Sequence, residues 1–263
     1  MQAYVDTFSV PKRGSTWQEY EDAACVEPSR ATLGERASSW LAAAVADGAS
    51  EGFLSGTWAR DLVNRFAEAG PTAELPATLA AGVAGWNAVE ADYCQGRQEA
   101  GDPIAWYEED KLRKGAYATI IAARLLDGET EGEGRLDVWA LGDACLFHVC
   151  DDEMVTAFPI TDPDEFGTAP ALAPSRPVDR TAVDRHIGHI TTTWRRGDQL
   201  LLASDALACW LLSQAAAGEA PWPAMRALHT AEGITDFAGW VDERRDDGSM
   251  RNDDTTLMRI DLI

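Results

Sequence analysis

Lysine and histidine are scarce in this sequence. Only three of its 22 basic residues are lysine, and it has four histidines. Acidic residues number 44, so the net charge is −22. A chain this acidic repels the phosphates of DNA and RNA, which excludes nucleic acid as an expected partner. The shortage of lysine is typical of a GC-rich genome and carries no chemistry.

Long apolar runs and closely spaced cysteines are also missing. No stretch approaches the roughly 20 apolar residues of a membrane span. The first residues lack the basic and apolar regions of a signal peptide. The five cysteines, at positions 25, 94, 145, 150 and 209, are scattered, which is typical of buried free thiols and not of a disulfide framework or a zinc site. We therefore expect a cytoplasmic protein without a membrane-spanning segment.

The patterns that are present predict one domain of mixed strands and helices over residues 1–263. The chain is 46% hydrophobic and long enough to bury a large core. Apolar runs predict strands over 3–10, 23–26, 38–46, 119–126, 136–141, 144–150, 154–158 and 200–204, and after residue 256. Helical spacing predicts helices over 51–69, 75–98, 104–113, 206–217, 222–230 and 235–245. Residues 159–180 hold five of the 12 prolines and predict a mobile loop excursion, of the kind that often borders a functional site.

Carboxylates stand at the ends of four of these apolar strands. Glu21-Asp22 and Asp253-Asp254 each precede a strand, whereas Asp47-Gly48 and Ser204-Asp205 each end one. Singly, such corners are more often plain turns or edge charges. If the four strands lie side by side, however, the acids cluster at one rim and need cations to stay ionised. Oxygen ligands without His or Cys favour Mg²⁺ or Mn²⁺, and two such ions can hold a hydroxide for attack on phosphate.

Six short stretches in this order resemble one family, the metal-dependent protein phosphatases, or type 2C serine/threonine phosphatases. They are Glu21-Asp22-Ala23, Val45-Ala46-Asp47-Gly48, Gly115-Ala116 with Thr119, Leu141-Gly142-Asp143, Leu201-Leu202-Ala203-Ser204-Asp205 and Asp253-Asp254-Thr255-Thr256. They span nearly the whole chain, and their loosened wording is similar to the divergent bacterial branch. The resemblance implies an α+β fold, a four-layer α/β/β/α sandwich with two packed antiparallel sheets.

The resemblance also implies a role for each matching residue. Asp47 would bridge two metal ions, and Gly48 would give its backbone carbonyl to one of them. Asp22, Asp205 and Asp253 would complete the metal ligands, with Glu21 and Asp254 beside them. Asp22 and Asp47 would thereby serve catalysis, in which a metal-bridging water attacks the phosphate. Gly142-Asp143 would be a structural turn.

Several positions depart from the family pattern. Trp17 stands where members often carry an Arg that grips the substrate phosphate, and Arg13 or Lys12 is the candidate substitute. Ala49 replaces a His that many members use as a general acid, and Ala206 replaces a Gly. The Asp of a third metal site is missing as well. Leu112 lies at about that position, and Asp110 is a loose candidate.

The sequence therefore predicts a Mg²⁺- or Mn²⁺-dependent hydrolase of phosphoserine and phosphothreonine in proteins, whose partner is the phosphoprotein product of a serine/threonine kinase. Two alternatives stay open: a catalytically silent binding module, and a small-molecule phosphatase on the same fold. Two weaker candidates lie outside the motifs. His186 and His189 could share a helix face and bind metal, although ordinary surface or core histidines are more common, and Trp106-Tyr107 could line a binding surface.

Overall fold

Two antiparallel sheets form the centre of the computed structural model, which describes residues 1–28, 38–49, 52–167, 169–177, 180–228 and 233–263. The first sheet has the order β1 (Ala3–Val10), β11 (Thr255–Leu262), β10 (Gln199–Ala203), β6 (Cys145–Cys150) and β7 (Glu153–Phe158). The second has the order β2 (Ala23–Glu27), β3 (Trp40–Gly48), β4 (Tyr117–Asp127), β5 (Glu133–Leu141) and β9 (Gly188–Arg195), and the short β8 (Ala173–Pro174) pairs with β4.

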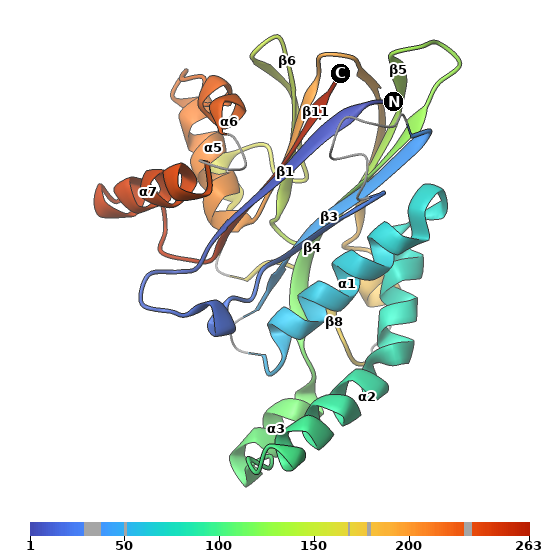
Figure 1. Cartoon of the computed structure of the whole chain (residues 1–263), viewed down its shortest axis with the longest axis vertical. Helices are drawn as coiled ribbons and strands as arrows, with labels where there is room; N and C mark the ends of the chain where they lie inside the picture. Colours follow the sequence, from blue (N-terminus) through green and yellow to red (C-terminus); the bar gives the residue numbers. More distant parts are fainter. Residues whose placement is uncertain (29–37, 50–51, 168, 178–179, 229–232) are drawn as a thin grey trace.

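Helices cover both outer faces of the sheet pair (Figure 1). The helices are α1 (Ser55–Ala69), α2 (Leu75–Glu99), α3 (Trp106–Lys114), α4 (Arg180–Asp184), α5 (Asp205–Ala216), α6 (Trp222–Ala227) and α7 (Gly233–Asp246), with 3-10 turns η1 (Trp17–Glu19), η3 (Gly70–Thr72) and η4 (Pro163–Glu165). Helices α5, α6 and α7 lie beside the first sheet, and α1 and α2 lie beside the second, whereas α3 extends beyond the sheets. The predicted α/β/β/α sandwich is confirmed.

Strand β3 is buried on both of its faces. Its alternate residues Leu41, Ala43 and Val45 pack between the two sheets, while the intervening alanines 42, 44 and 46 pack under the helices. Side chains alternate between the two faces of a strand, so a strand buried on both sides reads as a continuous apolar run. This run ends at Asp47, where the strand reaches the rim of the sandwich.

Helix α1 binds the second sheet through one apolar stripe. Trp58, Leu62 and Phe66 are fully buried and four residues apart, as the sequence pattern predicts. The Trp58 ring meets Trp86 of α2 edge-on at 5.3 Å between ring centres, and its indole Nε1 donates to the carbonyl of Ala173 in β8 at 2.9 Å. The helix is thereby fixed to both the sheet and the 159–180 segment.

Two strands differ from the sequence prediction. Strand β9 was missed because its Thr-rich sequence leaves alternate residues exposed and gives little apolar signal. Strand β8 shows that the segment expected to be an irregular loop in part extends a sheet.

The alternative that His186 and His189 share a helix face is wrong, because His189 lies in β9, where its ring stacks on Trp139 at 4.6 Å between ring centres.

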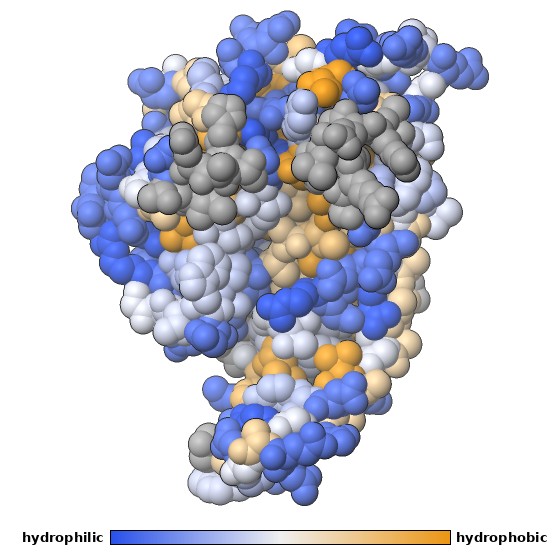
Figure 2. Space-filling model, viewed as in Figure 1, coloured by the Kyte–Doolittle hydropathy of each residue, from blue (hydrophilic) through white to orange (hydrophobic). Residues whose placement is uncertain are grey.

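Polar residues dominate the face shown in Figure 2, as expected for a chain with a net charge of −22. Within the described ranges, no helix is both long and apolar enough to cross a membrane. All five cysteines are free; Cys145 is buried as predicted, whereas the other four are only partly buried.

Candidate metal centre

Four aspartates from four strand ends meet at one rim of the sandwich. In the second sheet, the start of β2 pairs beside the end of β3, with Ala23 opposite Ala46, so Asp22 and Asp47 lie close together. In the first sheet, the end of β10 pairs with the start of β11, with Ala203 opposite Leu257. This pairing places Asp205 and Asp253 together in the same way. The site therefore takes two carboxylates from each sheet.

Burial and mutual repulsion shift the protonation of these acids. The pKa of Asp47 lies well above its ordinary value, because of burial first and then the charges of Asp22, Asp205 and Asp253. Burial raises the pKa of Asp22 to about 7. It also raises the pKa of Asp205, although the Arg251 charge lowers it in part. The carboxylates thus form one electrostatic cluster in which a proton or a cation is needed to relieve repulsion.

Two oxygens of the cluster have no hydrogen-bond partner among the residues that the structure describes. Asp22 Oδ1 and Asp205 Oδ1 are buried and accept no hydrogen bond. Buried carboxylate oxygens left unsatisfied are costly, and a hard divalent cation is the partner that oxygen-only donors favour. Among the described residues, no three Asp, Glu, His or Cys side chains converge on a single ion-sized point. The donor atoms are therefore of the type that Mg²⁺ or Mn²⁺ prefers, but among the described residues they do not surround one ion-sized point.

Asp254 holds the strand ends of the site in register. Its Oδ1 accepts the backbone N–H of Lys12 at 2.7 Å, and its Oδ2 accepts that of Glu21 at 2.8 Å. The Asp254 N–H in turn donates to Asp253 Oδ1 at 2.9 Å. One carboxylate thus joins the segments before β2 and β11, which carry Asp22 and Asp253.

Thr256 and Ser204 fix the position of Asp22. The Thr256 hydroxyl donates to Asp22 Oδ2 at 2.8 Å, and it also contacts the Tyr20 hydroxyl. The Thr256 backbone N–H donates to Ser204 Oγ at 2.9 Å. Asp22 from one sheet is therefore held by residues of the other.

Gly48 lets the start of α1 approach the end of β3. A Cβ atom at this position would lie 2.6 Å from the backbone carbon of Ser55, which is too close for any side chain. The Gly48 N–H donates to the carbonyl of Glu21 at 3.2 Å. The glycine thus has a packing role next to Asp47, and the expected use of its carbonyl as a metal ligand stays a prediction.

An open cleft of about 780 Å³ lies over the acid cluster. It is lined by the acids Asp47, Asp143, Asp205 and Asp253 and by the cations Lys111, Lys114 and Arg251. None of the three cations was predicted as a site residue, and Asp143 was predicted only as a turn residue. In the structure the Asp143 carboxyl is buried, and burial, followed by the nearby Asp205, raises its pKa to about 6. The Gly142-Asp143 dipeptide alone carries no signal of this placement.

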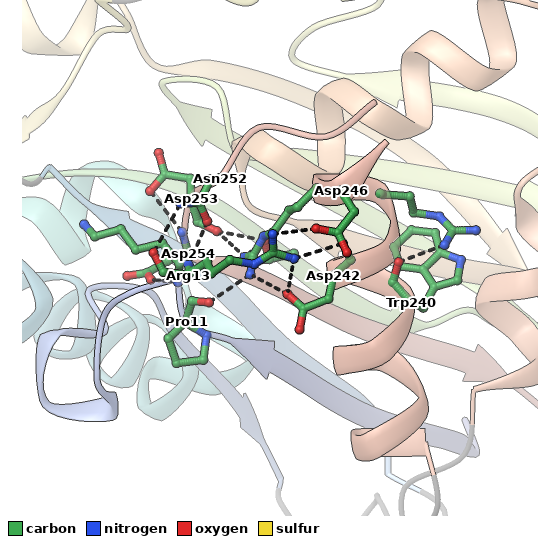
Figure 3. Close-up of polar contacts among 12 residues, drawn as sticks. Pro11, Arg13, Trp240, Asp242, Asp246, Asn252, Asp253 and Asp254 are labelled. Atoms are coloured by element: carbon green, nitrogen blue, oxygen red, sulfur yellow. Dashed lines mark hydrogen bonds and ion pairs between the residues drawn. The ribbon is translucent and has the colours of Figure 1, made fainter. Parts of the chain in front are cut away.

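The expected phosphate-binding residues lie elsewhere. Arg13 pairs with Asp246 at 2.7 Å and Asp242 at 3.3 Å on α7, as Figure 3 shows. Lys12 Nζ lies 3.9 Å from Glu21 Oε2. Neither basic residue lines the cleft. The position of the usual arginine holds Trp17, whose side chain is 61% exposed and packs on Tyr20.

The other candidate residues also lie outside the cleft lining. Asp110, considered for a third ion, pairs with Arg113 on α3, and Leu112 is buried. Trp106, at the start of α3, is 82% exposed but does not line the cleft. The 159–180 segment does border it, as expected, through Gly167, Ala169, Pro170 and Leu172.

Comparison with solved structures gives full-length matches. The serine/threonine phosphatase PstP of Mycobacterium tuberculosis matches with a TM-score of 0.55 and 17% identity, covering 100% of this chain and 99% of that one. The chain has the fold of the type 2C phosphatases. A Staphylococcus aureus serine/threonine phosphatase matches with a TM-score of 0.55, 13% identity, and coverage of 100% and 96%. RsbX, solved with magnesium, matches with a TM-score of 0.51, 14% identity, and coverage of 100% and 96%.

The PstP catalytic domain has also been solved with two manganese ions, and this structure matches with a TM-score of 0.53, 17% identity and full coverage of both chains. No family model matches the sequence, and no curated protein matches it. At these identities the likeness concerns the fold of this type 2C-like chain. Its activity must therefore be argued from its own residues.

Proposed function

We propose that this type 2C-like protein is a Mg²⁺- or Mn²⁺-dependent phosphatase of phosphoserine and phosphothreonine in proteins. The observation that carries the proposal is the electrostatic cluster of Asp22, Asp47, Asp205 and Asp253 under an open cleft. Repulsion among these four acids opposes folding, so their proximity does not stabilise the protein by itself. A bound cation would offset this repulsion.

Asp22, Asp47, Asp205 and Asp253 would hold the metal. Bound there, divalent cations supply a water of lowered pKa as nucleophile and positive charge for the phosphoryl group. The protein's own groups do the positioning. Asp254 fixes the segments before β2 and β11, and Thr256 orients Asp22. The solved PstP and RsbX structures with manganese and magnesium support this choice of metal.

A silent binding module is the second candidate. Trp17 at the usual arginine position and the lack of a closed ion cage among the described residues favour it. A small-molecule phosphatase on the same fold would need the same metal centre, and a panel of phosphopeptides and phosphorylated metabolites separates it from the first proposal. The cytoplasmic location and the kinase-derived phosphoprotein partner stay predictions.

Hydrolysis of p-nitrophenyl phosphate tests the proposal directly. The rate is measured with Mn²⁺, with Mg²⁺ and with EDTA, for the wild type and for Asp47→Asn and Asp205→Asn. Loss of a metal ligand removes several kcal/mol of transition-state stabilisation, so we expect rates to fall about 100-fold or more. Asp152→Asn, in the exposed turn between β6 and β7, is the matched control and should keep the full rate. Metal binding without turnover by the folded wild type would favour the binding module.

A further inference from the structure

Arg251 is a cleft residue for which the sequence motifs offer no role. It lies between α7 and β11, two residues before Asp253, and lines the cleft. Its Nη2 donates to Asp205 Oδ2 at 3.1 Å, while 48% of its side chain stays exposed. The guanidinium therefore touches the acid cluster on one side and faces open space on the other.

The chemistry of this group suits a phosphate. A guanidinium carries five N–H donors in a planar fork, and the hydrogen bond to Asp205 uses one of them. The free edge of the fork matches two oxygens of a phosphate, which arginine binds through parallel N–H···O bonds. Arg13 cannot serve, because two aspartates of α7 hold its guanidinium outside the cleft.

We propose that Arg251 binds the substrate phosphate and so replaces the arginine that is missing at Trp17. This inference rests on the proposed function, because it assumes that the cleft receives a phosphoryl group. The competing role is structural: the ion pair could merely orient Asp205. The two roles differ in what they change, since a phosphate ligand alters phosphate affinity and an orienting group alters metal affinity.

Calorimetric binding of inorganic phosphate, in the presence of Mg²⁺, tests the inference without turnover. A charged hydrogen-bonded pair is worth about 1.5–3 kcal/mol, so Arg251→Ala should weaken phosphate binding about 10- to 100-fold. Its Mn²⁺ affinity should not fall, because the variant keeps all four aspartates and frees Asp205 Oδ2, and Arg251→Lys should restore part of the phosphate affinity. Arg226→Ala is the matched control, because Arg226 forms a similar 3.1 Å pair with Asp152 and does not line the cleft.

Three outcomes would overturn the inference: no phosphate binding by the wild type, unchanged phosphate affinity in Arg251→Ala, or a loss confined to metal affinity. Turnover of p-nitrophenyl phosphate separates this result from the proposed function. A protein that binds phosphate through Arg251 but hydrolyses nothing would sustain the inference and refute the phosphatase. Normal turnover in Arg251→Ala, with unchanged KM, would support the phosphatase and refute the role of Arg251.

A separate observation concerns two lysines that line the same cleft. Lys111 and Lys114 of α3 are two of the three lysines in the chain, and both line the cleft. Two of the three acids that precede them on α3 pair with arginines, Asp110 with Arg113 and Glu108 with Arg97. Neither lysine forms an ion pair with any described residue. In a chain of net charge −22, these two lysines place local positive charge in the cleft beside the acid cluster.

We infer that the cleft prefers a phosphorylated peptide with acidic residues beside the phosphate. The inference also rests on the proposed function, and Lys111 and Lys114 would bind the acidic side chains. Each exposed ion pair is worth about 0.5–1 kcal/mol, so an acidic peptide should bind about 5- to 30-fold more tightly than one with neutral flanks. Because exposed pairs are screened by salt, the preference should shrink as NaCl is raised.

Fluorescence anisotropy with labelled phosphopeptides measures this preference whether or not they are hydrolysed. The double variant Lys111→Ala/Lys114→Ala should lose the preference for acidic flanks. Arg226→Ala, a surface arginine that pairs with Asp152 and does not line the cleft, should keep it. Equal binding of acidic and neutral peptides, or a preference that survives in the double variant, would refute the inference, while p-nitrophenyl phosphate turnover reports on the phosphatase independently.

Discussion

At the scale of single residues, Asp22 shows how the acid cluster affects the stability of the protein when no cation is bound. Burial raises its pKa from 3.8 to about 7, so the metal-free folded protein retains a proton that the unfolded chain releases. Stability from this group is fully present below about pH 4, the unfolded value, and is lost as the pH rises through the folded pKa near 7. Asp47, Asp205 and Asp143 are shifted in the same direction.

We therefore expect the free energy of unfolding in EDTA to fall between about pH 4 and pH 7, by up to about 1.4 kcal/mol per pH unit for each proton involved, and the unfolding temperature to fall with it. Asp22→Asn cannot titrate and should flatten this decline in part. Thermal unfolding followed by circular dichroism checks both statements. An equally steep decline in Asp22→Asn would show that other groups cause it.

Asp254 supports a second prediction at this scale. Asp254→Ala leaves the backbone N–H groups of Lys12 and Glu21 without their acceptor, which should lower the free energy of unfolding by about 2 kcal/mol or more. Asn252→Ala removes the Arg13 N–H acceptor at the exposed neighbouring position and should cost less. Urea denaturation of the two variants gives the comparison.

The same residues show what the sequence can and cannot predict about the site. The four strand-end aspartates could be found because each follows or precedes a clear apolar run. Arg251, Lys111 and Lys114 could not, since they stand in a loop and on a charged helix whose place beside the cleft depends on tertiary packing. Asp143 was found as a turn residue, but its burial next to Asp205 depends on the other strands.

At the scale of elements, apolar periodicity predicted α1, α2 and β3 because their side chains face a core that demands it. Strand β9 is at the sheet edge and β8 has two residues, so neither needs such a pattern. The contact between α1 and β3 matters for the site because it lies next to Asp47. Gly48, the following residue, has no side chain, and the start of α1 therefore packs directly against the end of the strand.

Gly48→Ala should therefore push α1 away from β3. Overpacking of this kind costs about 1–3 kcal/mol, and the shift of Asp47 should also weaken Mn²⁺ binding. Gly96→Ala in α2 is the control: its Cβ would meet nothing within 4 Å, and it should raise stability by about 0.5–1 kcal/mol. Wild-type Mn²⁺ affinity in a folded Gly48→Ala variant would contradict the argument.

At the scale of the whole molecule, the geometry of the site depends on how the two sheets pack against each other, because each sheet positions two of the four aspartates. Leu125 lies in the inter-sheet core, and its partner in the β3–β4 register is Leu41, far from the rim. Leu125→Ala should cost about 2–5 kcal/mol and also weaken Mn²⁺ binding, although it touches no ligand. Met225→Ala, in the core between the first sheet and its helices, should lose stability without that loss of affinity.

The division of the four aspartates between the sheets also sets when the site can exist during synthesis. Asp22 and Asp47 leave the ribosome early, whereas Asp205 and Asp253 belong to the last quarter of the chain. Strand β1 must likewise wait for β11, its partner from the other end of the sequence. A nascent chain therefore holds only Asp22 and Asp47 of the four until the segment with Asp205 and Asp253 has been made. The proposed metal centre therefore forms only after the residues through Asp253 have been synthesised and the two sheets have packed together.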